Sequence, residues 1–162
     1  MAAYVYWGAP DLLPALPGGA ALRPEGRLWD LCALGEGAGP ERLRCRTLLL
    51  PRGLYCPGWQ AGQAVEYGLD RRCSLTLSSM GERDVLCVQR TVTDVAGREL
   101  EPGEWPLPRR WRRFTPQQRL LAAGVWLLLG PSRPDGREIL VESDGNHGNS
   151  SAGIPNFWPD CT

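Results

Sequence analysis

The chain has 162 residues, 43% of them hydrophobic and 22% charged, and its formal net charge is zero, which are ordinary values for one globular domain. The balanced charge argues against a nucleic-acid binder that acts through an overall basic surface. The 20 glycines and 15 prolines favour many short elements joined by turns. We expect one globular domain over residues 1–151 and a C-terminal arm over residues 152–162.

The first residues predict no export or membrane insertion. The segment before residue 20 has no charged start, and Pro10, Pro14 and Pro17 interrupt it, so it does not have the pattern of a signal peptide. The chain contains no apolar run of the ~20 residues that a transmembrane helix needs. These features predict a cytoplasmic or otherwise intracellular protein without a transmembrane segment.

The six cysteines are expected to be reduced thiols, because disulfides are rare in intracellular proteins. No two of them form a Cys-x-x-Cys pair, and the chain has one histidine, so we expect neither a metal site nor a cofactor. The cysteines lie at positions 32, 45, 56, 73, 87 and 161.

Strand-like segments recur along most of the chain. The clearest is 41–50, in which Leu43, Cys45 and Thr47 alternate with arginines, as in a strand with one buried and one wet face. Residues 51–62 are expected to form a loop with exposed aromatic side chains. Strands recurring every 8–12 residues are typical of a small antiparallel sandwich or barrel, and this is the mainly β fold that we expect. The remaining strands are expected at 4–7, 27–34, 63–69, 73–79, 84–95 and 137–143.

One helix is expected near the C-terminus, over residues about 116–129. Thr115 is a favourable N-cap, Pro116 suits the first helical position, and Gln118 completes a capping box. Gly130 ends the helix. Residues 120–129 are apolar on every side, which is typical of a buried helix, and at ~1.5 Å per residue they are too short to cross a membrane.

A basic segment lies directly before this helix. Residues 109–119 contain five arginines and no acid, whereas the segments on both sides carry a net negative charge. All 18 basic residues of the chain are arginines, so it is free of lysine. Because the helix dipole disfavours positive charge at this end, counter-charges are needed. They are either internal acids such as Glu101 and Glu104, or an anionic partner bound by the guanidinium groups and the backbone N–H groups of Gln117 and Gln118.

Aromatic residues accompany the arginines. Trp111 and Phe114 are expected to lie at the surface, where they could stack on a base. Tryptophan and arginine are enriched at protein–protein interfaces, so other tryptophans in proline-rich or glycine-rich stretches are candidate partner-binding residues. The candidate anion-binding or partner-binding residues are Arg109, Arg110, Trp111, Arg112, Arg113 and Phe114, and the further partner-binding candidates are Trp59, Trp105, Phe157 and Trp158.

The leading functional prediction is a non-enzymatic structural or adaptor subunit. It would bind another macromolecule, or a second copy, through its Arg/Trp-rich loops and C-terminal arm. The first alternative is a nucleic-acid-binding protein that uses residues 109–119. The second is a small hydrolase-like enzyme that uses His147, the single histidine, which lies close in sequence to Asp144 and to several serines. No catalytic residue is assigned, because the chain has no Gly-x-Ser-x-Gly motif.

Overall fold

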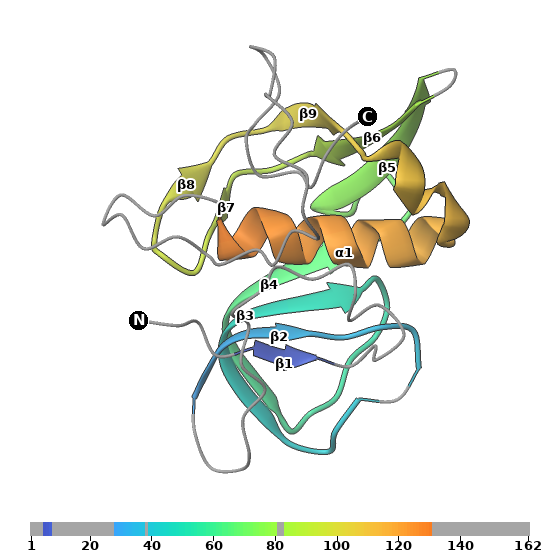
Figure 1. Cartoon of the computed structure of the whole chain (residues 1–162). Helices are drawn as coiled ribbons and strands as arrows, with labels where there is room; N and C mark the ends of the chain where they lie inside the picture. The colour runs from blue at the N-terminus through green and yellow to red at the C-terminus, as the bar shows by residue number, and fades with distance from the viewer. Residues whose placement is uncertain (1–4, 8–27, 38, 81–82, 131–162) are drawn as a thin grey trace, which may run out of the picture.

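The computed structural model describes residues 5–7, 28–37, 39–80 and 83–130 (Figure 1). The expected strand at 137–143, the C-terminal arm and His147 lie outside these residues. In chain order the elements are β1 (Val5–Trp7), β2 (Trp29–Ala33), β3 (Leu43–Pro51), β4 (Trp59–Tyr67), β5 (Leu75–Met80), β6 (Arg83–Val88), β7 (Val92–Thr93), β8 (Glu99–Leu100), β9 (Gly103–Pro106), the 3-10 helix η2 (Arg109–Arg113) and α1 (Pro116–Leu129).

Among the described residues, seven strands form one curled sheet in the order β1-β2-β3-β4-β5-β6-β9, and β7 pairs with β8 in a separate hairpin (Figure 1). The prediction of a mainly β protein with one buried C-terminal helix is therefore confirmed. The expected antiparallel pairing holds for β5 with β6, β6 with β9 and β7 with β8. It is wrong for the first five strands, which pair in parallel.

The parallel strands form a coil. Residues paired between β2, β3 and β4 are sixteen positions apart, as Trp29 with Cys45 and Cys45 with Ala61. Parallel neighbours are usually joined by a crossover of a dozen or more residues that contains a helix. Here β3 and β4 are joined by residues 52–58 alone, so the chain winds back on itself and each turn pairs with the next. Local alternation of apolar and polar residues is the same in both strand directions, which is why it did not reveal this pairing.

A bend in β3 closes the coil. The ladder omits Arg46, since pairing passes from Cys45 directly to Thr47 on both sides of the strand. Before the bend the odd-numbered side chains face the interior of the coil, and after it the even-numbered ones do. The coil therefore encloses a small apolar cluster of its own, formed by Cys32, Leu34, Leu43, Cys45, Leu48 and Leu50, with Trp29, Leu54 and Trp59 packed against it.

The strand boundaries differ most from those predicted in β4 and in the segment 84–95, and β8 and β9 were not predicted. β4 begins at Trp59 instead of residue 63, because Trp59, Gln60 and Ala61 pair with β3 although they lack apolar alternation. A Cβ atom at Gly58 would collide with the carbonyl oxygen of Glu41, so only glycine allows the two coil turns to approach here. The expected strand over 84–95 is divided into β6 and β7.

α1 lies across the sheet and packs against β2, β3, β4 and β5 (Figure 1). Its bounds are those predicted, and the capping box is present: Gln118 N donates to Thr115 Oγ1 at 3.2 Å, and Thr115 N donates to Gln118 Oε1 at 2.9 Å. Every residue from Leu120 to Gly130 is buried. The main core lies between this helix and the concave side of the sheet.

Candidate anion-binding surface

The five residues of η2 follow β9 and precede α1. A 3-10 helix has three residues per turn, so residues three apart share a face. Pro108 and Trp111 are buried on one face and Phe114 is half-buried below them. The same periodicity leaves four arginines of the segment exposed, namely Arg109, Arg110, Arg112 and Arg113.

Trp111 anchors this short helix in the core. Its side chain is 1% exposed and belongs to the main apolar cluster. The expectation that Trp111 is a surface residue able to stack on a base is therefore wrong. The surrounding prolines suggested an irregular surface loop, whereas a single 3-10 turn is enough to direct the indole inward.

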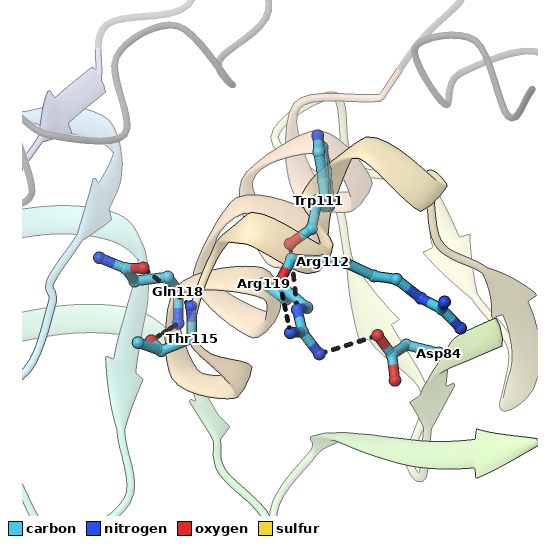
Figure 2. A network of polar contacts seen from close by, with 6 residues as sticks. All are labelled: Asp84, Trp111, Arg112, Thr115, Gln118 and Arg119. Carbon is cyan, nitrogen blue, oxygen red and sulfur yellow. Dashed lines mark hydrogen bonds and ion pairs between the residues drawn. The ribbon is translucent and has the colours of Figure 1, made fainter. Parts of the chain in front are cut away.

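Arg119 connects η2 to α1 and β6 through hydrogen bonds of its side chain (Figure 2). Its guanidinium donates to the carbonyl oxygens of Trp111 and Arg112, both at 3.0 Å, and so satisfies backbone acceptors at the end of η2. The same group donates to Asp84 Oδ2 at 2.8 Å, which connects α1 to β6. Arg119 thus has a structural role, which no local pattern indicates because Asp84 is 35 positions away.

Three of the exposed arginines have no counter-charge among the described residues. Arg110, Arg112 and Arg113 have no carboxylate within 4.0 Å in the part of the chain that the structure describes. The two acids expected to neutralise them make other contacts. Glu101 Oε2 accepts from Thr91 Oγ1 at 3.5 Å, and Glu104 Oε1 accepts from Cys87 Sγ at 3.7 Å.

Phe114 supports the end of this surface. The guanidinium carbon of Arg113 lies 4.9 Å from the centroid of the Phe114 ring, which is a cation–π distance. Because Phe114 is itself half-buried, the contact holds Arg113 beside the protein surface. The ring is consequently covered by Arg113 on one face, which leaves less of it for stacking with a ligand.

At the N-terminus of α1, Gln118 N, one of the two backbone donors expected to hold an anion, already donates to Thr115 Oγ1 at 3.2 Å. The capping box that begins the helix is therefore an alternative to anion binding at this position. Any anion bound here would be held mainly by guanidinium groups.

Of the other candidate residues, the structure describes Trp59 and Trp105, and both pack against apolar clusters. Trp59 is half-buried in the coil, where its Nε1 donates to Pro40 O at 2.7 Å. Trp105 is half-buried on β9 and packs against the main core. Phe157 and Trp158 lie outside the described residues, as does His147.

Comparisons with known proteins identify no family for this chain. No protein-family model, no curated protein and no solved structure matches this chain. Within the described ranges no helix has both the length and the hydropathy to cross a membrane. The same residues contain no cluster of three or more His, Cys, Asp or Glu side chains suited to a metal ion.

Proposed function

We propose that the protein is a non-enzymatic adaptor or structural subunit that docks on an acidic surface of another protein through Arg110, Arg112 and Arg113. The observation that carries the proposal is the placement of three exposed guanidinium groups, without a neighbouring carboxylate in the described structure, on one short helix. That helix is held by the buried Trp111 and by the hydrogen bonds of Arg119. A fixed array of guanidinium groups suits carboxylates because each can bind in a bidentate manner.

The burial of Trp111 and the partial covering of Phe114 favour a protein partner over nucleic acid. Binding of single strands combines a basic groove with exposed aromatic rings on which bases stack. Trp111 is buried and Phe114 is partly covered by Arg113, so these two residues support no such platform. Duplex binding through phosphates alone remains the second candidate, since it needs only the guanidinium groups.

The test compares two triple variants with equal loss of charge. The first is Arg110→Gln, Arg112→Gln, Arg113→Gln. The matched control is Arg71→Gln, Arg72→Gln, Arg90→Gln, which removes three exposed arginines elsewhere on the surface. Binding of a fluorescein-labelled oligoglutamate and of a duplex DNA of similar charge is followed by fluorescence anisotropy over a range of salt concentrations.

We expect the first variant to bind oligoglutamate roughly five- to tenfold more weakly, because each exposed ion pair contributes well under the energy of a tenfold change. The control should retain the wild-type affinity. The thermal stability of the first variant should equal or slightly exceed that of the wild type, since arginines before a helix N-terminus oppose the helix dipole. The control should be as stable as the wild type. Equal weakening of both variants would show attraction by bulk charge. Unfolding of the first variant would show that its arginines are internal counter-ions, and either result overturns the proposal.

Nucleic acid would produce a different pattern. For a duplex contacted by three arginines, the logarithm of the affinity should fall with the logarithm of salt concentration with a slope of roughly −2.7. Tighter binding of DNA than of oligoglutamate, with that slope lost in the first variant, would favour the second candidate.

A further inference from the structure

β4 has an open edge. On one side it pairs with β3 along its whole length, from Trp59 to Tyr67. On the other side its pairing with β5 is confined to Tyr67 with Leu75. Every second backbone N–H and C=O group of the earlier part of β4 therefore faces away from β3, where the described residues provide no strand.

A side-chain contact marks where this open edge ends. The Gln63 carboxamide forms two hydrogen bonds with the backbone of Thr93, as a residue of a neighbouring strand would. Its Nε2 donates to Thr93 O and its Oε1 accepts from Thr93 N, both at 2.8 Å. β7 thus lies against β4 at Gln63. The open segment is consequently residues 59–62, which we call the β4 edge.

The β4 edge is accessible to another chain. Gln60, Ala61 and Gly62 are all exposed. Natural edge strands are commonly protected by charged residues, proline or bulges that hinder pairing with a further strand. Residues 59–62 contain no charge and no proline, and the small side chain of Ala61 and the absence of one at Gly62 allow a second backbone to approach closely.

A row of arginines on β3 runs beside the β4 edge. Arg42, Arg44 and Arg46 are exposed, and Arg44 lies opposite Gln60 in the register. Arg46 contacts Asp30 at 3.7 Å, whereas Arg42 and Arg44 have no carboxylate within 4.0 Å in the described part of the chain. A strand added to the β4 edge would thus lie one strand away from two unneutralised guanidinium groups.

We propose that the β4 edge accepts an extended acidic segment of a partner protein as an additional strand. The backbone of that segment would hydrogen-bond to the outward N–H and C=O groups of residues 59–62, except Trp59 N, which already donates to Cys56 O. Its acidic side chains on the outer face would extend past Gln60 toward Arg42 and Arg44. Binding of this kind obtains affinity from backbone hydrogen bonds and specificity from alternate side chains. The site is separate from η2 and does not depend on the function proposed above.

Charge decides between this partner and a second copy of the chain. Two copies that paired β4 edge to β4 edge about a two-fold axis would bring their two arginine rows toward each other. The two arginine rows would then be three strand spacings apart, with weak mutual repulsion and no acidic side chain from the second copy to neutralise them. An acidic strand replaces this repulsion with attraction, so it is the occupant that the surface favours.

The experiment uses four capped octapeptides and the full chain. The first probe alternates valine and glutamate. The second alternates valine and lysine. The third and fourth have the sequence of the first but carry N-methyl groups on alternate amides, each in one of the two possible phases, which removes backbone donors without changing charge. Binding is measured by titration followed by NMR, and backbone amide exchange is compared with and without the peptide.

The glutamate peptide should bind and slow the amide exchange of residues 60–62. The lysine peptide should not bind, and one phase of N-methylation should weaken the glutamate peptide at least about tenfold, since several backbone hydrogen bonds are lost. The variant Arg42→Gln, Arg44→Gln should weaken it about three- to tenfold. The control Arg71→Gln, Arg72→Gln should bind as the wild type does.

Three results would overturn the proposal. If both N-methylated peptides bound as tightly as the unmodified peptide, no strand would be added to the edge. Protection of amides elsewhere, with residues 60–62 unaffected, would place the peptide at another surface. A concentration-dependent dimer that protects residues 60–62 without peptide would assign the β4 edge to a second copy.

Discussion

Two buried polar side chains, those of Tyr67 and Asp94, are satisfied by specific partners. The Tyr67 hydroxyl donates to Leu34 O at 2.8 Å, and burial raises the pKa of Tyr67 well above its usual range. The carboxylate of Asp94 is fully buried and accepts from Ala96 N, Arg98 N and Arg98 Nε. This turn lies against Gly130 at the C-terminus of α1, where a cation such as Arg98 is favoured by the helix dipole.

Two cysteines show that the interior of the coil is protected from solvent. Cys32 and Cys45 are 0% and 3% exposed and share a side-chain hydrogen bond. That bond and burial raise the pKa of the Cys32 thiol far above its usual range. Since the thiolate is the reactive form, Cys32 is expected to be inert in the native state.

Trp111→Ala should destabilise the protein by about 3–5 kcal/mol, because removal of a fully buried indole leaves a cavity in the main core. Urea unfolding followed by circular dichroism measures the change. Trp105→Ala is the matched control: Trp105 is half-buried, so its replacement should cost clearly less. Equal losses for the two variants would show that η2 is not anchored by Trp111.

At the scale of elements, the sequence predicted what local chemistry determines. The bounds of α1 were found because Thr115, Pro116 and Gly130 carry their signals within the helix itself. The direction of the strands depends on contacts sixteen positions apart, which alternation within one strand does not report. η2 was missed as an element because five residues are too few to show a period, so Trp111 was placed on the wrong side of the surface.

The capping box offers a direct test of how α1 begins. Thr115→Ala removes the acceptor for Gln118 N and should lower the free energy of unfolding by about 1 kcal/mol. Thr115→Ser retains the hydroxyl and should cost only a fraction of this. Both are measured by urea unfolding. If the serine variant lost as much stability as the alanine variant, the hydrogen bond would not be what stabilises the N-terminus of α1.

At the scale of the whole molecule, α1 connects two parts of the sheet. It packs against β2, β3 and β4 of the coil and also against β5, which begins the antiparallel part. The coil has its own small apolar cluster, but the main core includes residues from both parts and from the helix. We therefore expect the described chain to unfold as one cooperative unit.

Thiol reactivity measures this cooperativity. Trp126 belongs to the main core and is 4% exposed, so Trp126→Ala should cost about 3–5 kcal/mol. If unfolding is cooperative, alkylation of Cys45 in the coil and of Cys87 on β6 should accelerate together, by roughly 10²- to 4 × 10³-fold, when reclosing outpaces alkylation. Cys56 is half-buried in a surface loop and serves as the control, with a rate expected to be nearly unchanged.

Rates at each site are read by peptide mass spectrometry. Acceleration at Cys87 without acceleration at Cys45 would mean that the coil is held by its own cluster and keeps its fold when the helix no longer stabilises the rest.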